Sequence, residues 1–292
     1  MIAKSILITG GSGSFGRAFV RRLLRGSLSE RICVYSRGEH RQAEMREELG
    51  DDQRLRWFIG CVRDLPRLRR AMNGVDVVVH AAALKRIEVG ARDPLEMKKT
   101  NIDGSANVID AAQDAGVKKV VFISSDKAFE AVSPYGKSKS YAEDLFLAAN
   151  NTVPAEGPRF AVCRYGNIFS SAGSVVPRWR EMIAKGAKVV PTTDPDCTRF
   201  FMKIEEAVDL VLCAIETMPA EPLIPDLPAY RLGDLAEAMG VLMDVRGLPH
   251  WEKKAEGMAP GNTSDKARRM SVAELREKLA EIGFRPRIAE AA

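Results

Sequence analysis

The sequence lacks a hydrophobic run long enough to cross a bilayer. Its longest apolar stretches, 75–84 and 207–215, are interrupted by a histidine and an aspartate, whereas a membrane-spanning helix needs about 18 or more apolar residues. The N-terminus has one lysine and then a short apolar stretch that runs into glycines, without the long apolar core or cleavage site of a signal peptide. We therefore expect no membrane segment and a first β-strand of a cytoplasmic protein.

Cysteine and histidine are scarce and scattered. The five cysteines are an odd number with no C-x-x-C pair, and the three histidines lack the close spacing of metal ligands. This pattern fits neither a disulfide framework nor a zinc site. We expect buried free thiols and no metal, and we interpret His80, at the end of an apolar run, as a structural histidine and not a ligand.

An excess of charge of one sign is also absent. The chain has 44 basic and 39 acidic residues, a net charge of +5. The basic residues are spread along helical stretches without interleaved aromatic residues, so solvated helix faces are favoured over nucleic-acid binding. The mild positive balance suits a small anionic substrate. No internal repeat and no low-complexity tract is visible.

What the first half does contain is a regular alternation of short β-branched runs and helical stretches, which predicts parallel strands joined by crossover helices. The strands are apolar throughout, so both faces of the sheet should be covered. The expected strands are 5–8, 32–35, 56–59, 75–80, 120–124 and 160–164, and the expected long helices are 93–115, opened by Asp-Pro, and 135–150. We predict an α/β fold, a Rossmann-type doubly wound parallel sheet.

A second, smaller lobe is expected after the sheet. The length of 292 residues is about twice the ~150 typical of one domain, and proline, glycine and aspartate become frequent after Pro154, with four prolines within 218–228. We predict a dinucleotide-binding domain at 1–165 and a C-terminal, mainly substrate-binding lobe at 166–292. Within the latter, a helix at 203–217 returns to the first domain, and further helices lie near 232–239 and 271–282.

The first motif that carries chemistry is TGGSGSFG, residues 9–16, between the first strand and the first helix. Glycines at this spacing allow a tight turn, a close approach of the backbone to a pyrophosphate, and close packing of helix on strand, and the helix N-terminus attracts the anion. A plain glycine-rich turn is the competing interpretation. The predicted dinucleotide-binding residues are Gly10, Ser12, Gly13, Ser14, Phe15 and Gly16.

The end of the second strand indicates which dinucleotide binds. NAD-binding proteins place an acidic residue there for the ribose hydroxyls, but this chain has Ser36 and Arg37, with Arg41 one helical turn further on. A guanidinium matches a 2′-phosphate, so NADP is favoured over NAD. The alternative is that the arginines are surface residues and Glu39 serves the ribose.

The third motif is FISSDKAFEAVSPYGKSK, residues 122–139, which leads from the fifth strand into the next helix. Sites in parallel sheets form at the carboxyl ends of strands, so residues 124–127 should face the cofactor. Tyr135 and Lys139 are four residues apart and share one helix face. We expect the lysine ammonium to lower the pKa of the tyrosine and make it a base. Ordinary helix packing could also explain the spacing.

Together these motifs resemble those of the extended short-chain dehydrogenase/reductases. Within them the chain is most similar to the inverting UDP-N-acetylglucosamine 4,6-dehydratases that open pseudaminic acid and related deoxysugar pathways. The resemblance covers about 4–216 and, more thinly, 232–258. It also rests on YSRGEHRQAEM, VVVHAAALK, PLEMKKTNIDGSANVI, RYGN, GSVVP and TRFFM. The most telling match is Asp126-Lys127, because plain 4-epimerases lack this pair and retaining dehydratases have Asp-Glu.

The resemblance implies an NADP-dependent lyase that inverts C5 without net redox change. Ser125 would bind the sugar 4-hydroxyl while Tyr135 removes its proton and hydride passes from C4 to NADP+. Lys127, if neutral, would abstract the C5 proton, and Asp126, if protonated, would donate to the departing 6-hydroxyl. Hydride would then return to C6. A surface ion pair is the competing interpretation of Asp126 and Lys127.

The resemblance also implies binding roles. Further dinucleotide contacts are expected from Cys61, Val62, Ala81, Ala82, Ala83, Lys85 and Asn101, together with Tyr135 and Lys139. Substrate contacts are expected from Lys85, Tyr165, Asn167, Val175 and Arg199, with Asn167 and Arg199 on the diphosphate. Asn101 would also orient the active-site helix and a water. Helices 93–115 and 135–150 form dimer faces in similar proteins, so a homo-oligomer is expected.

Several positions depart from the family pattern. Cys61 replaces the aspartate that meets the adenine amine, residues 86–93 differ from the family, and Ala131 and Ser133 replace a proline and an asparagine. A thiol is a poor acceptor, so adenine recognition would rely on the Val62 backbone or be weaker. Two other functions stay open: a nucleotide-sugar epimerase or dehydratase of altered regiochemistry, and a non-catalytic NADP-binding regulator or scaffold.

Overall fold

The computed structural model describes residues 1–285 of the chain, which divide into two compact units. Unit 1 comprises Met1–Tyr165 and Ile204–Pro225, and unit 2 comprises Gly166–Lys203 and the described residues from Asp226 onward. No helix among residues 1–285 is long and apolar enough to span a membrane. The motifs at 9–16 and 122–139 both lie in unit 1.

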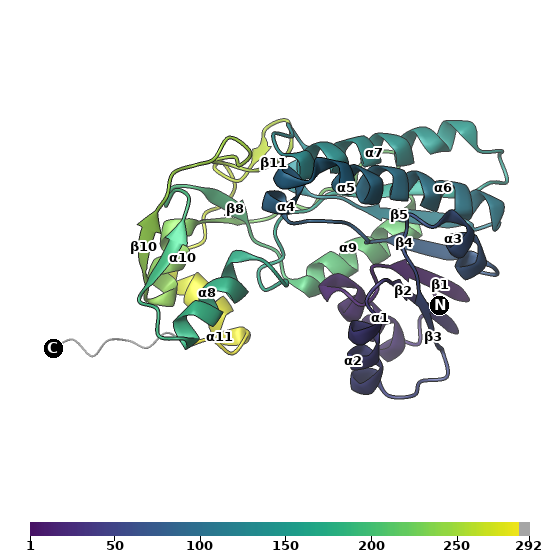
Figure 1. Cartoon of the computed structure of the whole chain (residues 1–292), viewed down its shortest axis with the longest axis horizontal. Coiled ribbons are helices and arrows are strands. Elements are labelled where there is room, and N and C mark those ends of the chain that lie inside the picture. Colours follow the sequence, from purple (N-terminus) through teal and green to yellow (C-terminus); the bar gives the residue numbers. More distant parts are fainter. Residues whose placement is uncertain (286–292) are drawn as a thin grey trace. The chain divides into compact units, whose positions relative to one another are not determined.

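Unit 1 is built on a six-stranded parallel sheet in the order β3-β2-β1-β4-β5-β6 (Figure 1). Its strands are β1 (Ser5–Thr9), β2 (Arg31–Ser36), β3 (Leu55–Ile59), β4 (Val77–His80), β5 (Lys119–Ile123) and β6 (Arg159–Cys163). Thr9 pairs with Tyr35 on one side and His80 on the other, so the carboxyl ends of the central strands lie level. The predicted Rossmann-type sheet and its six strands are confirmed.

Helices cover both faces of this sheet (Figure 1). Helices α3, α6 and α7 contact one another in turn, and α1 contacts α9. All five residues of β1 are buried, as expected for a strand covered on two sides. Phe122 of β5, Phe146 of α7 and Phe160 of β6 belong to one buried cluster between the sheet and the first helix layer. The helices are α1 (Ser14–Arg25), α2 (Glu39–Leu49), α3 (Leu65–Met72), α4 (Ile87–Arg92), α5 (Pro94–Lys98), α6 (Gly104–Asp114), α7 (Pro134–Thr152) and α9 (Ile204–Thr217).

The expected single helix over 93–115 is corrected in one respect. Asp93 caps α5, whose first residue is Pro94, but a π-helical segment, η1 (Lys99–Asp103), separates α5 from α6. The wider turn holds the buried side chain of Asn101, which bonds to Leu84 and Ser138 outside its own helix. π-helical turns inside α-helices are frequent at functional sites. A period-3.6 pattern does not reveal this insertion.

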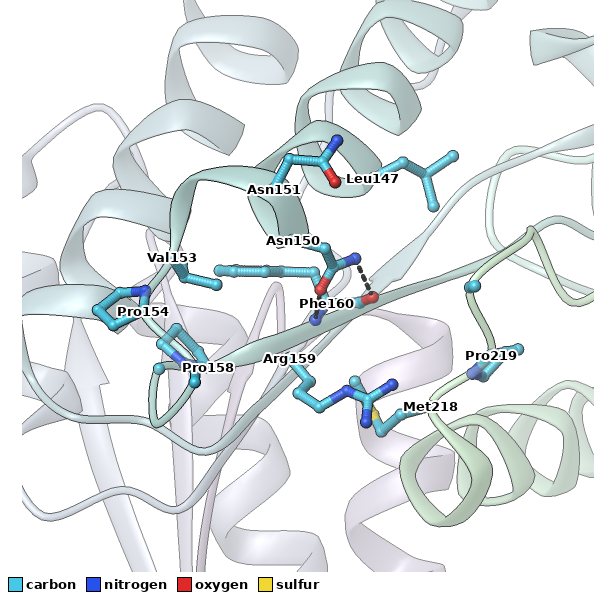
Figure 2. Close-up of a pocket in the computed structure, with 13 residues that line it drawn as sticks. Leu147, Asn150, Asn151, Val153, Pro154, Pro158, Arg159, Phe160, Met218 and Pro219 are labelled. Atoms are coloured by element: carbon cyan, nitrogen blue, oxygen red, sulfur yellow. Dashed lines mark hydrogen bonds between the residues drawn. The ribbon is translucent and has the colours of Figure 1, made fainter.

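Helix α7 is attached to strand β6 near its C-terminal end. The Asn150 side chain donates to the Phe160 carbonyl and accepts from the Phe160 N–H, both at 2.9 Å (Figure 2). At the other end, Ser133 caps the helix by accepting from the Gly136 N–H at 3.0 Å, and Pro134 occupies the first turn. Both contacts fix the helix that carries Tyr135 and Lys139.

Unit 2 contains three helices around its own apolar cluster, which includes Trp179, Tyr230 and Leu235. The helices are α8 (Val175–Ala184), α10 (Leu232–Met239) and α11 (Val272–Glu281), and the strands are β7 (Val189–Thr192), β8 (Thr198–Phe200), β9 (Ala229–Arg231), β10 (Leu242–Val245), β11 (Gly257–Ala259) and β12 (Asn262–Thr263). The two helices predicted near 232–239 and 271–282 are confirmed.

All five cysteines lie in the described part of the chain and are free thiols. Cys33, Cys163 and Cys197 are buried as expected, but Cys61 is half-buried and Cys213 is exposed. Cys213 lies on the solvent-facing side of α9. Its neighbours Val211, Leu212 and Ala214 are buried. The expectation that all the thiols are buried was therefore wrong for these two.

Candidate active site

The loop between β1 and α1 has the geometry of a phosphate-binding turn. Gly10 has φ +67°, and a Cβ there would lie 2.9 Å from the backbone of Ala82, so no larger residue fits. The Gly13 N–H donates to the Gly10 carbonyl at 2.9 Å. Gly13 also caps α1 without any side-chain hydrogen bond. The helix N-terminus therefore keeps amides available for an anion.

Ser36, at the end of β2, is used inside the protein. Its hydroxyl oxygen accepts from Ser12 Oγ and from Gln42 Nε2, each at 2.9 Å, and the residue is buried. The glycine-rich loop is thereby joined to β2. Arg37 and Arg41, in contrast, are exposed and free to meet a ligand from solvent. Their contact with a 2′-phosphate stays a prediction.

Lys85 and Arg41 belong to the same positively charged region. The surrounding protein atoms and, second, the charge of Arg41 lower the pKa of Lys85. The like charges of Lys85 and Arg41 repel each other, and an anion bound near both would relieve that repulsion. This local repulsion suits a phosphate group.

Where the adenine of the dinucleotide is expected, the backbone carbonyls of Cys61 and Val62 accept hydrogen bonds from within the protein. The Tyr35 hydroxyl donates to the Cys61 carbonyl at 2.8 Å, and Asn107 Nδ2 donates to the Val62 carbonyl at 3.0 Å. Val62 itself is buried. These contacts fix the loop after β3. The role of Cys61 and Val62 in adenine recognition stays a prediction.

The loop after β4 runs beside the glycine-rich turn. The Ala81 N–H donates to the Thr9 carbonyl and the Ala82 N–H to the Thr9 hydroxyl, both at 3.2 Å, and Ala83 follows half-buried. Asn101 then holds this loop, because its side chain exchanges hydrogen bonds of 2.8 and 2.9 Å with the backbone of Leu84. Asn101 Nδ2 also donates to Ser138 Oγ of α7 at 2.9 Å. Its amide thus links a cofactor loop to the helix of Tyr135 and Lys139.

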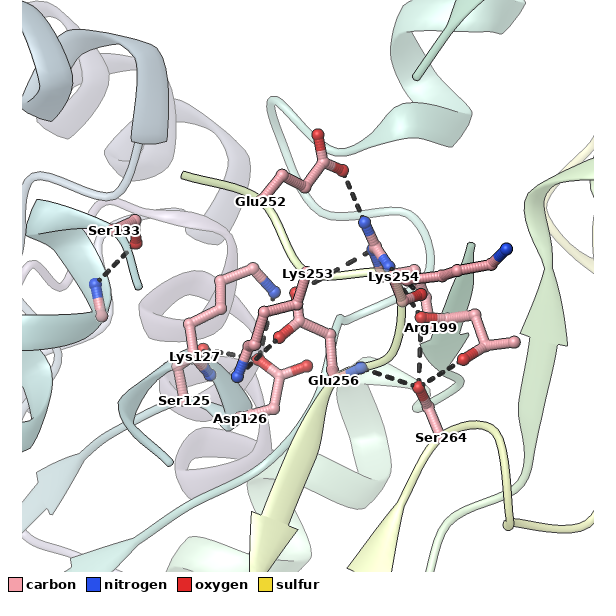
Figure 3. Close-up of polar contacts among 12 residues, drawn as sticks. Ser125, Asp126, Lys127, Ser133, Arg199, Glu252, Lys253, Lys254, Glu256 and Ser264 are labelled. Atoms are coloured by element: carbon pink, nitrogen blue, oxygen red, sulfur yellow. Dashed lines mark hydrogen bonds and ion pairs between the residues drawn. The ribbon is translucent and has the colours of Figure 1, made fainter. Parts of the chain in front are cut away.

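The residues that follow β5 form a compact polar cluster (Figure 3). Asp126 is fully buried, and its Oδ1 accepts from Ser125 Oγ at 2.7 Å and from Lys127 Nζ at 3.1 Å. The Asp126 N–H donates to the Tyr165 carbonyl at 3.0 Å. The Lys127 side chain is 15% exposed. Asp126 and Lys127 are therefore not the exposed surface pair of the competing interpretation.

This cluster packs directly on the first turn of α7. A Cβ at Gly136 would lie 2.2 Å from the Lys127 carbonyl, so glycine beside Tyr135 permits the close approach of the two segments. Tyr135 lies within reach of all three residues. Burial raises its pKa to about 12, and the charge of Asp126 also raises it. The charge of Lys127 and a hydrogen bond with Ser125 lower this pKa. Ser125, Asp126, Lys127 and Tyr135 are thus brought together.

One expectation about this tyrosine needs correction. The charge that chiefly lowers the pKa of Tyr135 is that of Lys127 and not that of Lys139. The physical reason is where the Lys139 ammonium points. It donates to the Ile123 carbonyl at 2.5 Å and lies 3.9 Å from the centre of the Phe122 ring. Burial lowers the pKa of Lys139 to about 7, and the Glu143 carboxylate opposes this effect.

The expected substrate residues are divided between the units. Tyr165, in unit 1, is buried, and burial together with neighbouring Cys163 and Tyr135 raises its pKa well above the usual value. Asn167 and Val175, in unit 2, are half-buried. Arg199 is buried, and its guanidinium donates to Glu252 at 2.5 Å and to the Thr198 and Lys254 carbonyls (Figure 3). Its charge is already balanced within unit 2.

The prediction that His80 is a structural histidine is confirmed, because it is buried and bonds to Thr9 at 2.6 Å and to Ser105 at 3.2 Å. Burial and the charge of Lys139 lower its pKa to about 3. Sequence reasoning missed another buried group, Glu143. Glu143 is buried four residues after Lys139 and pairs with Arg164. The only sequence signal for Glu143 was an acidic residue on the helix face of Tyr135 and Lys139.

A surface pocket elsewhere in unit 1 is a poor candidate for the site. It is lined by residues around Asn150, Pro154, Arg159 and Met218 (Figure 2). Arg159 begins β6, so this pocket lies at the amino end of the strand, whereas ligands of α/β sheets bind at the carboxyl ends. Within residues 1–285 no group of three or more His, Cys, Asp or Glu side chains could hold a metal ion.

Comparison with known proteins places the chain in a family. A family model described as a polysaccharide biosynthesis protein matches residues 6–270. The chain belongs to this polysaccharide biosynthesis protein family. A relative from Campylobacter jejuni, UDP-N-acetylglucosamine 4,6-dehydratase (inverting), is 45% identical over 264 residues, which cover 89% of this chain and 79% of the relative. The resemblance to extended short-chain dehydrogenase/reductases of the inverting dehydratase type is thereby confirmed.

The chain is also similar to a second curated protein and to a solved structure. UDP-glucose 4-epimerase from Rickettsia conorii is 37% identical over 277 residues, which cover 91% of this chain and 80% of the epimerase. Among solved structures, that of Pen from Bacillus thuringiensis superimposes with a TM-score of 0.91 at 30% identity, covering 96% of this chain and 98% of that one. The relatives therefore include two different nucleotide-sugar enzymes.

Proposed function

We propose that the chain is an NADP-dependent nucleotide-sugar 4,6-dehydratase that inverts C5 and acts on UDP-N-acetylglucosamine or a related UDP-sugar. The carrying observation is the buried Asp126, whose Oδ1 binds both Ser125 and Lys127. Elimination of water needs an acid and a base beside one another, and this pair supplies both. The 45% identity to an inverting dehydratase supports the same assignment.

The residues present fit a nicotinamide dinucleotide. Gly10 leaves no space for a Cβ, and the first turn of α1 has no side-chain cap, so backbone amides would hold the pyrophosphate. Arg37 and Arg41 would hold a 2′-phosphate, and Tyr135 and Lys139 would lie at the nicotinamide end. When bound, the nicotinamide accepts hydride from the sugar and later returns it.

In the oxidation step, Tyr135 takes the proton of the sugar 4-hydroxyl. The phenol is costly to ionise here, because burial raises its pKa to about 12. The Lys127 charge and the Ser125 hydrogen bond oppose that effect, and a bound cationic nicotinamide ring would add to them. Ser125 would also orient the 4-hydroxyl. The product of the step is a 4-ketone, which acidifies the C5 proton.

In the elimination step, Lys127 takes the C5 proton and Asp126 gives a proton to the departing 6-hydroxyl. This requires a neutral amine and a neutral acid. One proton moved from Lys127 Nζ to Asp126 Oδ1, across their 3.1 Å hydrogen bond, converts the ion pair into that state. Exclusion of water by the substrate favours the neutral pair, because both charges lose hydration. Elimination regenerates the ion pair and releases one water.

The final step adds hydride at C6 and a proton at C5. Protonation of C5 from the face opposite to Lys127 gives the inverted product, and the proton derives from solvent. One hydride leaves C4 and one arrives at C6, so the dinucleotide is not consumed. In this proposal Lys85, Tyr165, Asn167, Val175 and Arg199 contact the substrate, with Asn167 and Arg199 on its diphosphate. An Arg199 contact with the diphosphate requires that Glu252 give up its place on the guanidinium.

The alternatives make different demands on the same residues. A 4-epimerase needs oxidation and reduction at C4 but no second acid and base, so Asp126 and Lys127 would have no task. The Rickettsia epimerase at 37% identity favours keeping this candidate as an outcome of the test. A non-catalytic regulator would need none of the catalytic side chains, yet all five, Ser125, Asp126, Lys127, Tyr135 and Lys139, are present.

The direct test is turnover of UDP-N-acetylglucosamine by the purified protein with NADP+, followed by mass spectrometry. We expect a product lighter by one water, with no net formation of NADPH. A substrate that keeps its water but changes configuration at C4 would favour the epimerase. If UDP-N-acetylglucosamine is unchanged, a set of nucleotide sugars can be compared by the increase in Tm, since a ligand of the folded state stabilises it.

If the chain prefers NADP, variants of Arg37 and Arg41 should lose affinity for NADP but not for NAD. Each charge-assisted hydrogen bond contributes about 1.5–3 kcal/mol, so Arg37→Gln or Arg41→Gln should weaken NADP binding by about 10- to 100-fold. The affinity for NAD should change little, because NAD lacks the 2′-phosphate. Calorimetric titration with both dinucleotides measures this difference. Equal losses for NAD and NADP would contradict the assignment.

The expected homo-oligomer would form through the outer surface of α5 and α7. Leu95 of α5 is 59% exposed and Tyr141 of α7 is 54% exposed, and the two helices contact each other. Leu95→Glu should therefore convert the assembly into monomers, measured by light scattering at micromolar concentration. Leu242→Glu, at a 71% exposed position of unit 2, serves as control. A wild-type monomer under these conditions would refute the prediction.

A further inference from the structure

Helix α7 carries a buried carboxylate one turn beyond Lys139 to which the steps above give no task. Glu143 is 3% exposed. It follows Lys139 by four residues, as Lys139 follows Tyr135. Positions four apart lie on one face of a helix, so Tyr135, Lys139 and Glu143 form a continuous stripe along α7.

Arg164 binds both oxygens of this carboxylate. Its Nε donates to Oε1 at 2.9 Å and its Nη2 donates to Oε2. A bidentate pair fixes the orientation of a carboxylate as well as its charge. Arg164 follows β6 directly, and its N–H donates to the Leu223 carbonyl at 3.0 Å. The pair therefore attaches the middle of α7 to the carboxyl end of β6, next to Tyr165.

The other groups around Lys139 are uncharged, so the Glu143 carboxylate is its counter-charge. The ammonium contacts the Ile123 carbonyl and the Phe122 ring, which carry no charge. His80 of β4 is also near, but its pKa of about 3 keeps it neutral at neutral pH. Among residues 1–285, Glu143 is the anion whose charge acts on Lys139, and Arg164 is the cation that binds Glu143.

We propose that Glu143 and Arg164 are a positioning pair for the reaction: Glu143 favours the protonated form of Lys139 in its buried place, and Arg164 holds Glu143 there. The enzymatic part of this inference rests on the proposed function. A protonated Lys139 would donate a charge-assisted hydrogen bond to the nicotinamide ribose of a bound dinucleotide and would place a positive charge behind the stripe that ends at Tyr135. A neutral amine would do neither. Neither Glu143 nor Arg164 needs to touch the sugar.

The pKa of Lys139 lies close enough to neutral pH for the Glu143 charge to change the protonation state of the amine. Burial lowers the pKa of Lys139 to about 7, with Glu143 raising it against that effect. An opposite charge at this range shifts a pKa by about 1–3. Without the Glu143 charge, the ammonium should lose its proton at a pH lower by about that amount, and Lys139 should be mainly neutral at neutral pH.

The test is an NMR titration of the full chain labelled with carbon-13 at lysine Cε. The Lys139 signal is assigned by its absence in Lys139→Met. We expect a midpoint near 7 in the wild type and a midpoint lower by about 1–3 in Glu143→Gln. If loss of one charge prevents folding, Glu143→Gln/Arg164→Gln removes both charges of the pair and should shift the midpoint in the same direction.

The matched control is Asp144→Asn, which removes the same charge from the next, exposed position of α7. It should leave the Lys139 midpoint unchanged. A midpoint that stays at the wild-type value in Glu143→Gln, or one that falls equally in Asp144→Asn, would overturn the proposal. This experiment needs no substrate, so its outcome is independent of whether the chain proves to be a dehydratase.

Kinetics give the second readout once a substrate is known. In Glu143→Gln the alkaline limb of kcat should move to lower pH, because kcat falls as Lys139 loses its proton. KM for the nucleotide sugar should change less than kcat, and Glu143→Asp should restore part of the activity. A loss of stability with an unchanged pH profile would show that the pair is structural alone and would refute the proposed role.

Discussion

Lys127→Met is expected to lower turnover of the nucleotide sugar by about 10²- to 10⁴-fold, the usual contribution of a general base. The variant removes the amine that takes the C5 proton but leaves Tyr135 and Ser125 in place. Oxidation at C4 should slow, because the Lys127 charge that lowers the pKa of Tyr135 is lost, but reduced dinucleotide should still accumulate on the enzyme because elimination cannot follow. Its absorbance in a single-turnover experiment, read together with product formation, measures both effects.

The matched control for this variant is Lys137→Met. Lys137 is an exposed lysine two residues after Tyr135, so the same change in charge and shape should leave turnover near the wild-type value. Asp126 keeps its hydrogen bond from Ser125 in Lys127→Met but loses the Lys127 cation, and removal of one member of a buried ion pair costs stability. Tm and NADP affinity must therefore be measured alongside. Unchanged turnover in a folded Lys127→Met protein would refute the assignment of the base.

Tyr135→Phe is expected to lower turnover to a similar extent by stopping an earlier step. Without the phenol, nothing takes the 4-hydroxyl proton, so hydride cannot leave C4 and no reduced dinucleotide should form. The ring itself is kept, which preserves packing on the Gly136 turn. The control is Tyr141→Phe, because Tyr141 lies on the same helix and is 54% exposed. Reduced dinucleotide at the wild-type rate in Tyr135→Phe would contradict the account.

The two variants also test the order of the steps. Lys127→Met should stall after oxidation, and Tyr135→Phe should stall before it. The double variant should then behave as Tyr135→Phe does, since the step that Lys127 serves is never reached. A double variant that still accumulates reduced dinucleotide would show that oxidation does not need Tyr135 and would contradict the account.

The sheet could be predicted from the sequence because its strands are apolar on both faces. β1, β2, β4, β5 and β6 are short β-branched or aromatic runs separated by helical stretches, and parallel strands buried on two sides produce that pattern. The glycine-rich turn was also predictable, since Gly10 occupies a backbone conformation that other residues rarely adopt. Local patterns of this kind are visible in one segment of chain.

The site was less predictable where it depends on distant contacts. The π-helical turn contains Asn101, whose amide bonds to Leu84 and to Ser138, which are 17 and 37 residues away in the sequence. The direction of the Lys139 ammonium, toward Ile123 and Phe122, is likewise set by the fold. The motif spacing alone suggested that it acts on Tyr135.

Charge compensation was hardest to foresee. Arg199 and Glu252 are 53 residues apart, and Glu143 and Arg164 are 21 apart. Sequence patterns place each of these residues on its own element but do not show which carboxylate meets which guanidinium. Arg199 therefore looked like a phosphate ligand without a counter-charge, and Glu143 went unnoticed.

The central claim, elimination with inversion at C5, is tested most directly by NMR of the reaction with UDP-N-acetylglucosamine and catalytic NADP+ in deuterium oxide. The account predicts a 4-keto-6-deoxy product with inverted C5, one solvent deuterium at C5, and the original C4 hydrogen transferred to C6. Deuterium at C5 in a sugar that keeps its 6-hydroxyl, or a product that retains protium and configuration at C5, would contradict it.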